Sequence, residues 1–195
     1  FVILLVSGMP IKYLFGLAVA GIASSPVLWH FLKDYQKRRL LVFVNPNMDP
    51  LGAGYTIIQS KIAIGSGGLF GRGWMGGTQN QLNFLPESHT DFIFAVVGEE
   101  WGFIGSLFII FLFAFLISRI LSVAERTNDF YGKMIVIGVA GMLSFQVLVN
   151  IAMTIGLMPV VGIPLPFISY GGSSLIMNFM AIALVINIDM HRTLF

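Results

Sequence analysis

The chain has 195 residues, of which 56% are hydrophobic and 10% charged, and its 11 basic and 9 acidic residues give a formal net charge of +2. Soluble domains carry about a quarter charged residues, whereas membrane spans of about 20 apolar residues each accommodate this composition, so we expect an integral membrane protein without a separate soluble domain. The small positive excess excludes nucleic acid as a partner class and is compatible with anionic lipid head groups, and the lack of cysteine excludes disulfides, iron–sulfur clusters and thiolate zinc sites.

The first half of the chain predicts two spans followed by a long loop. Residues 1–6 are typical of the last turns of a truncated span, so we expect a fragment whose earlier helices are missing. Residues 13–32 predict a full span, in which Pro26 kinks the helix rather than ending it. Residues 33–91 contain no window able to cross a bilayer, and we expect a large interfacial loop there, with a short helix lying on the membrane over residues 55–65.

The remainder, residues 92–192, predicts three further spans and a short helix before the first of them. A polar turn is expected over residues 118–133, and residues 157–174, rich in proline and glycine, predict a re-entrant or turn segment. Residues 1–195 are therefore predicted to form one all-α polytopic membrane domain, a helix bundle with four full spans and part of a fifth. The three later spans are expected at residues 101–117, 134–155 and 175–188.

Basic residues favour an orientation with the large loop outside the cell and the carboxy-terminus in the cytoplasm. The positive-inside rule then holds for most of the short connections, but a basic cluster at the start of the loop breaks it. An anionic lipid head group or pyrophosphate near that cluster would explain its position. The residues on the inner side would be Lys12, Arg119, Arg126, Lys133, His191 and Arg192, and the outer cluster is Lys37, Arg38 and Arg39.

Asp91 is the leading catalytic candidate, because a carboxylate at the start of an apolar helix is partly desolvated, which raises its pKa toward the range of a general base. The pattern alone favours a second interpretation, in which Asp91 only caps that helix. Glu99 and Glu100 follow about two turns later. They are either functional carboxylates at membrane depth or interfacial residues beside a helix break near Gly98 and Gly102, and the sequence leaves both open.

Other polar or glycine-rich stretches carry weaker predictions. The glycine-rich residues 65–77 lack the lysine and serine of nucleotide-binding loops, so a flexible loop is favoured over a phosphate site. Gln146 and Asn150 are four residues apart on one helix face and could join helices by hydrogen bonds. Tyr170 lies either in a cavity wall or in a simple helix-start turn. The histidines are too dispersed for a zinc signature: His30, His89 and His191.

Two long stretches resemble one family of bacterial enzymes. They are "NPNMDPLGAGYTIIQSKIAIGSGGLFGRGWMGGTQNQLNFLPESHTDFIFAVVGEEWGFIG" and "MPVVGIPLPFISYGGSS". With them the chain is similar, over residues 1–192, to the carboxy-terminal half of the SEDS family of peptidoglycan polymerases (RodA/FtsW/SpoVE). The stretches "QSKIAIGSGG" and "GTQNQLNFLPE" resemble the rod-shape (RodA) branch more closely than the division (FtsW) branch. The motif "LPE..TDFIF" is shared by both branches.

The resemblance implies a multi-pass protein of the bacterial inner membrane that polymerises lipid II, an undecaprenyl-pyrophosphate disaccharide pentapeptide, during cell elongation. It also implies that Asp91 is the family's essential aspartate, acting as general base or as ligand of a divalent cation such as Mg²⁺ or Mn²⁺, while no other cofactor is expected. Basic side chains would offset the pyrophosphate charge. The candidate substrate-binding residues are Lys37, Arg38, Arg39, Gln59, Ser60, Lys61, Arg72, Glu87, His89, Thr90, Ser169, Tyr170, Gly171, Gly172 and Ser173.

The same resemblance implies partners and leaves alternatives. Expected partners are a class B penicillin-binding protein, which is a transpeptidase, other proteins of the elongation complex, and membrane lipid. The competing functions are a flippase that moves lipid II across the membrane and a scaffold that only recruits the transpeptidase. We expect the 195-residue chain alone to be inactive, because losing half the helices would leave polar faces against lipid.

Overall fold

The computed structural model describes residues 2–49, 52–77, 84–85 and 89–191. Within these residues every regular element is a helix, which confirms the predicted all-α class. In chain order they are α1 (Val2–Val6), α2 (Ile11–Phe31), α3 (Asp34–Val44), the 3-10 helix η1 (Pro46–Met48), α4 (Ala53–Gly67), α6 (Ile93–Glu100), α7 (Gly102–Arg126), α8 (Phe130–Thr154) and α9 (Gly172–His191).

Four of these helices, α2, α7, α8 and α9, are long and apolar enough to cross a membrane, so the four predicted full spans are confirmed. The expected polar turn over residues 118–133 is wrong in extent, because α7 continues to Arg126 and α8 begins at Phe130. At 1.5 Å per residue the 25 residues of α7 extend about 37 Å, beyond the roughly 30 Å of hydrocarbon. The charged end of α7 therefore stays helical outside the apolar layer.

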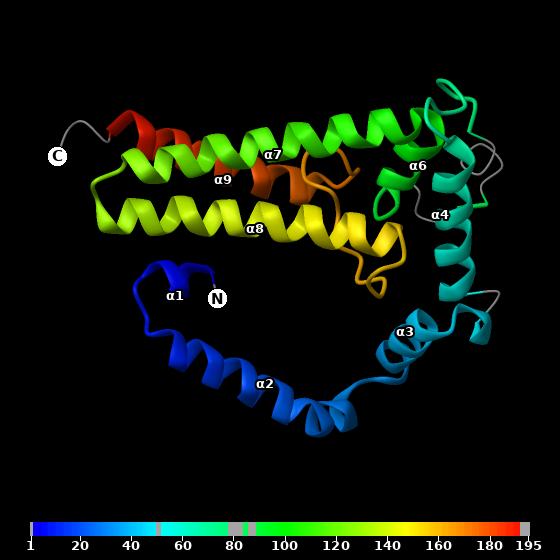
Figure 1. The fold of residues 1–195 in the computed structure, drawn as a ribbon, viewed down its shortest axis with the longest axis horizontal. Helices are drawn as coiled ribbons and strands as arrows, with labels where there is room; N and C mark the ends of the chain where they lie inside the picture. The colour runs from blue at the N-terminus through cyan, green and yellow to red at the C-terminus, as the bar shows by residue number, and fades with distance from the viewer. Residues whose placement is uncertain (1, 50–51, 78–83, 86–88, 192–195) are drawn as a thin grey trace.

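The centre of the molecule is a three-helix bundle. α7 and α8 run antiparallel, with α9 beside them (Figure 1). Their shared core consists of small and branched side chains: Ile120, Ala124, Val136, Ile137, Val139, Ala140, Leu143, Ala181 and Val185. This packing makes α8 the most buried of the four candidate spans. α1 packs on α8, whereas α2 has Leu14 as its one buried residue and continues through Pro26 as predicted.

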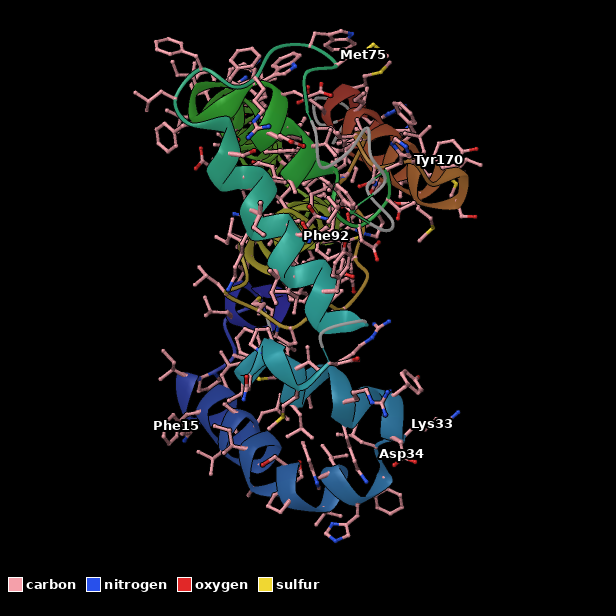
Figure 2. All side chains as sticks on the ribbon, turned by 90° about the vertical axis from the view of Figure 1, so that its right-hand side faces the viewer. Phe15, Lys33, Asp34, Met75, Phe92 and Tyr170 are labelled. Atoms are coloured by element: carbon pink, nitrogen blue, oxygen red, sulfur yellow. The ribbon has the colours of Figure 1, made fainter. Side chains whose placement is uncertain are left out.

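α4 crosses one end of this bundle (Figure 1). It confirms the short helix predicted over residues 55–65, and its direction, across the spanning helices, is that of a helix lying along a membrane surface. α4 packs on α6 through a core of Ala63, Leu85, Phe92 and Ala95. Figure 2 views the molecule from this side, with Phe92 in the middle and Met75 and Tyr170 opposite Lys33 and Asp34 at the start of α3.

The glycine-rich run after α4 is bound to the break between α6 and α7. The backbone amides of Arg72 and Gly73 donate to the carbonyls of Glu99 and Glu100, both at 3.0 Å. In return the amide of Phe103 donates to the carbonyl of Gly68 at 2.9 Å. The expectation of a flexible loop is corrected by these bonds. They form because glycines let the two backbones approach within the space a Cβ would need.

Candidate active site

Three consecutive backbone carbonyls before α6 are each held by a donor from a distant part of the chain. Tyr170 N donates to His89 O at 2.9 Å, Ser169 Oγ donates to Thr90 O at 2.6 Å, and Asn150 Nδ2 donates to Asp91 O at 2.9 Å. Residues 89–91 are turns before α6, whereas the carbonyl of Phe92 already accepts from Ala95 N of the helix at 2.9 Å. These three bonds therefore fix the backbone that carries Asp91.

Asn150 supplies its bond from inside the bundle. It is fully buried near the end of α8, and its Nδ2 also donates to Ile163 O at 2.8 Å. One amide group thus joins the Asp91 backbone to the irregular segment between α8 and α9. The sequence predicted that Gln146 and Asn150 could join helices, whereas Asn150 joins two loops to α8, and the buried Oε1 of Gln146 has no hydrogen-bond partner among the described residues.

The Asp91 carboxylate faces the α-carbon of Gly162 on that irregular segment. A Cβ built on Gly162 would lie 3.2 Å from Asp91 Oδ2, and Gly162 has a φ of +77°. Phe92 occupies the capping position of α6, which begins at Ile93, so Asp91 lies one residue before the cap. The N-cap position that the capping interpretation assigned to Asp91 is held by Phe92.

An open cavity of about 630 Å³ lies beside this backbone. Predicted site residues contribute to its wall, where the side chain of Tyr170 is 81% exposed and that of Ser169 is buried. Of the two interpretations of Tyr170, the cavity wall is the one that this arrangement supports. The lining residues are His89, Ile93, Phe167, Ile168, Ser169, Tyr170, Gly171, Gly172 and Leu175.

Two of the predicted basic residues reach the irregular segment that carries Gly162. Arg39, on α3, donates from Nη1 to Val160 O at 3.2 Å. The stem of Lys61, on α4, covers Gly156 so closely that a Cβ there would overlap it. Both side chains are exposed, so their charges are accessible to a ligand. The α3 and α4 helices thus bring cations to the segment against which the Asp91 carboxylate lies.

Other predicted substrate-binding residues are not assembled with Asp91. Ser60 is fully buried and donates from Oγ to Thr154 O at 2.7 Å, so it has no surface with which to contact a substrate. Arg72 donates from Nε to Ser66 O at 3.3 Å, at the far end of α6. Among the described residues, no hydrogen bond joins this region to Lys37 and Arg38 on α3, half-buried Gln59 on α4 or exposed Ser173 in α9. Glu87 lies outside the described residues.

Burial distinguishes between the two interpretations of Glu99 and Glu100 at the end of α6. Glu99 is fully buried, and a Cβ on buried Gly77 would lie 2.8 Å from Glu99 Oε2, whereas Glu100 is half-buried. Glu99 therefore lies inside the protein rather than at an aqueous interface. The helix break is where the sequence suggested it, since α6 ends at Glu100 and Gly102 has a φ of +67°.

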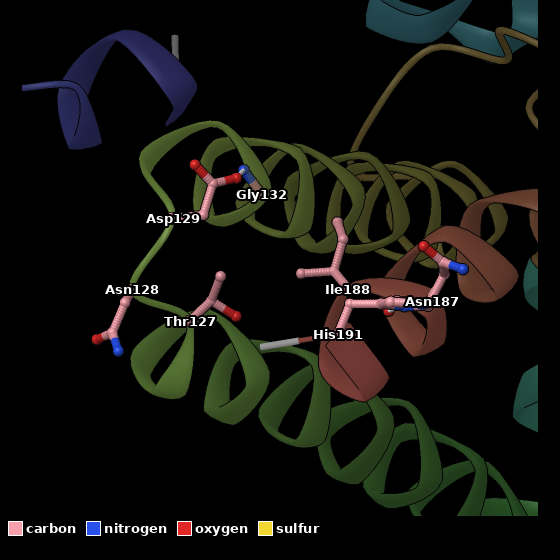
Figure 3. A pocket seen from close by; sticks show the side chains of 7 residues that line it. All are labelled: Thr127, Asn128, Asp129, Gly132, Asn187, Ile188 and His191. Atoms are coloured by element: carbon pink, nitrogen blue, oxygen red, sulfur yellow. Dashed lines mark hydrogen bonds between the residues drawn. The ribbon is translucent and has the colours of Figure 1, made fainter. Parts of the chain in front are cut away.

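A second open cavity, of about 640 Å³, lies at the other end of the bundle (Figure 3). Two of its polar side chains make hydrogen bonds to backbone groups at helix ends. Asp129 accepts from Gly132 N at 2.7 Å, and His191 Nδ1 lies 2.9 Å from Asn187 O. Gly132 and Asn150 are 18 residues apart on α8, which is about 27 Å along the axis. This cavity is therefore separate from Asp91.

The sequence analysis did not predict that Gly162 lies against the Asp91 carboxylate. It predicted hydrogen bonds from Asn150 but not their acceptors. No pattern marks Gly162 among the 22 glycines of the chain, whereas the buried amide of Asn150 in an apolar span did give a signal. Among the described residues no three histidine, aspartate or glutamate side chains gather in a way that could hold a metal ion. Any cation at Asp91 would need oxygen ligands from substrate or water.

Comparison with known proteins finds one family. Residues 1–194 match the family FTSW_RODA_SPOVE, described as "Cell cycle protein". Peptidoglycan glycosyltransferase MrdB of Escherichia coli K12 is 50% identical over 192 residues, which are 97% of this chain and 52% of MrdB. Peptidoglycan glycosyltransferase RodA of Treponema pallidum is 46% identical over 182 residues, 93% of this chain and 42% of that protein.

A solved structure has the same fold. In work on the structural coordination of polymerization and crosslinking by a peptidoglycan synthase complex, one chain matches with a TM-score of 0.78 and 39% identity, covering 98% of this chain and 53% of that one. The chain spans about half the length of the relatives that it matches.

Proposed function

Because the chain belongs to the FTSW_RODA_SPOVE family, we propose that the whole protein is a peptidoglycan glycosyltransferase that polymerises lipid II during cell elongation. The relatives named MrdB and RodA are peptidoglycan glycosyltransferases, and the RodA relative supports the rod-shape branch over the division branch. Lipid II is a suitable substrate class for this fold, since its isoprenoid tail stays in hydrocarbon while its sugars reach the aqueous side where α4 lies across the bundle.

The reaction requires a base and a stabilised leaving group. A sugar 4-hydroxyl of one lipid II attacks the anomeric carbon at the end of the other chain, the bond from that carbon to pyrophosphate oxygen breaks, and the polyprenyl pyrophosphate leaves with the electron pair. The Asp91 carboxylate takes the hydroxyl proton. The observation that carries this assignment is the backbone of residues 89–91, whose three carbonyls are held so that the carboxylate keeps a fixed place against Gly162.

Arg39 and Lys61 are the cations we assign to the departing pyrophosphate, because both side chains lie on the segment that faces Asp91. Of the described residues, Asp91 would be the protein ligand of a divalent cation, which would add positive charge beside the same phosphates. The sugar site would be bounded from the cavity wall by His89, Tyr170 and the glycines at 171 and 172.

We further propose that the loop with α3 and α4 faces the periplasm and that the end of α9 faces the cytoplasm. A class B penicillin-binding protein would be the partner within the elongation complex. The matched chain from a complex that couples polymerization to crosslinking supports a partner of this kind. The orientation is supported by the positive-inside rule through Arg119 and Arg126 in the last two turns of α7 and Lys133 in the first turn of α8.

The test is polymerisation by the full-length purified protein, reconstituted with its transpeptidase and fluorescent lipid II. We expect glycan ladders on a gel from the wild-type protein and none from Asp91→Asn or Asp91→Ala, while Asp34→Asn, an exposed carboxylate at the start of α3, retains them. Ladders from both Asp91 variants would exclude Asp91 as the base. Unpolymerised lipid II that moves between leaflets would identify a flippase, and partner binding without either activity would identify a scaffold.

A further inference from the structure

The buried amide of Asn150 does more than fill a gap in the bundle. Its Nδ2 donates to Asp91 O at 2.9 Å and to Ile163 O at 2.8 Å, so its two N–H groups are both used on loop carbonyls. Its Oδ1 is buried and has no hydrogen-bond partner among the described residues. A side chain whose donors alone are engaged, both outside its own helix, serves to hold those two loops together.

Ser169 completes the connection from the other side. Its hydroxyl donates to Thr90 O at 2.6 Å and accepts from Leu165 N at 2.7 Å. The next residue, Tyr170, donates its amide to His89 O. The segment from Ile163 to Tyr170 is therefore tied to residues 89–91 at both of its ends, by Asn150 at one and by Ser169 and Tyr170 at the other.

We propose that Asn150 and Ser169 are positioning residues for Asp91: they set where its carboxylate stands relative to the cavity and to Gly162, without contacting substrate themselves. This inference rests on the proposed function of Asp91. The physical reason is that residues 89–91 lie in turns before α6, where tertiary donors rather than the hydrogen bonds of the helix hold their carbonyls. Both donors are rigid, since Asn150 is fully buried and Ser169 is 8% exposed.

The chain offers a matched control in Ser60. Its buried hydroxyl also makes a tertiary bond at 2.7 Å to α8, one turn from Asn150, but that bond joins α4 to Thr154 and does not involve residues 89–91. Ser60→Ala therefore removes the same kind of bond from the same helix. A merely structural effect would appear equally in this variant.

The experiment compares Asn150→Asp, Asn150→Leu, Ser169→Ala and Ser60→Ala in the full-length protein with its transpeptidase and lipid II. Asn150→Asp keeps the side-chain shape but replaces the amide donor with a carboxyl oxygen that faces the two carbonyls, Asn150→Leu removes the polar group without adding charge, and Ser169→Thr keeps the hydroxyl. We expect kcat to fall by about 10- to 100-fold in the first three variants, with KM for lipid II changed by about threefold or less, because a displaced catalytic group costs rate rather than binding. Ser60→Ala and Ser169→Thr should stay within about threefold of wild type in kcat.

A second readout does not depend on activity. Hydrogen exchange of the peptide that covers residues 165–171, which contains the Tyr170 amide, should accelerate in Asn150→Asp and Ser169→Ala but not in Ser60→Ala. Folded Asn150 and Ser169 variants with wild-type kcat, or with unchanged exchange in this peptide, would overturn the inference. If the wild-type protein makes no glycan, the proposed function fails, and the exchange measurement still decides whether these residues hold the loop.

Discussion

The Asp91 carboxylate lies against the bare α-carbon of Gly162, 71 positions later in the chain. A Cβ on Gly162 would lie 3.2 Å from Asp91 Oδ2. This distance is tighter than most real Cβ contacts, so any side chain at Gly162 would push on the carboxylate. The contact shows that the wall opposite the proposed base must be glycine for two reasons, because Gly162 also has a φ of +77°.

Gly162→Ala should lower polymerisation at least about tenfold, because the new methyl displaces the Asp91 carboxylate. The positive φ alone should cost about 1–2 kcal/mol of stability. Gly8→Ala is the matched control: Gly8 has a φ of +83° and nothing within 4 Å of its Cβ position, so it carries the same backbone strain far from Asp91. Equal activity in both variants would show that the space beside Asp91 is not needed.

Arg39→Gln and Lys61→Gln should each raise the KM for lipid II by about tenfold, because a charge-assisted contact to pyrophosphate is lost. The difference from wild type should shrink as salt concentration rises, since both side chains are exposed. Lys33→Gln removes an exposed charge just before α3 and should change KM little. The same KM increase in Lys33→Gln would point to a general charge effect instead of a site at these two residues.

Gly67→Ala should destabilise the packing of α4 on α6 by about 1–3 kcal/mol, since its Cβ would overlap Gly98 O. Gly65→Ala, two residues earlier in α4, meets nothing within 4 Å and should instead stabilise the helix by about 0.5–1 kcal/mol. Thermal unfolding in detergent, followed by circular dichroism, should move in opposite directions for the two variants. A loss of stability in both would mean that helix propensity is not the deciding factor at Gly65.

Asp129→Ala should cost about 1 kcal/mol of stability, because the carboxylate caps α8 by accepting from Tyr131 N and Gly132 N. Asn128→Ala, at the neighbouring exposed position, should leave the unfolding midpoint unchanged. Polymerisation per folded molecule should be the same in both, since this end of the bundle is remote from Asp91. A selective loss of activity in Asp129→Ala would assign a function to the cavity of Figure 3.

The proposed orientation can be tested directly, because the chain contains no cysteine. In a full-length protein in which any cysteine outside residues 1–195 is replaced, Met75→Cys places one thiol in the exposed glycine-rich run beside the start of α7, and Asn128→Cys places one just after its end. A membrane-impermeant maleimide applied to cells with a permeable outer membrane should label Met75→Cys alone, and both variants after lysis. Labelling of Asn128→Cys while the inner membrane is intact would show that the topology is the opposite of the one proposed.

The sequence by itself determined the fold class and the number of spans. A helix that crosses hydrocarbon must be long and apolar, so the apolar stretches of the sequence were enough to predict α2, α7, α8 and α9 as spans. It determined less well where α7 ends, because charged helix formers such as Arg126 continue a helix as readily as they mark a turn. It also singled out Asp91 as a candidate base, although the pattern could not separate that role from helix capping.

Tertiary structure alone decided which residues surround Asp91. Asn150, Gly162 and Ser169 are 59 to 78 positions away in the chain, and no local pattern encodes their approach. The structure also excluded Ser60 from the candidate substrate-binding residues, because its hydroxyl is buried against α8. It further showed that backbone amides of the glycine-rich run near Arg72 donate to backbone carbonyls. Burial and hydrogen-bond partners are properties of segments brought together by folding, which is why apolar periodicity could place the helices but not the partners of the carboxylate.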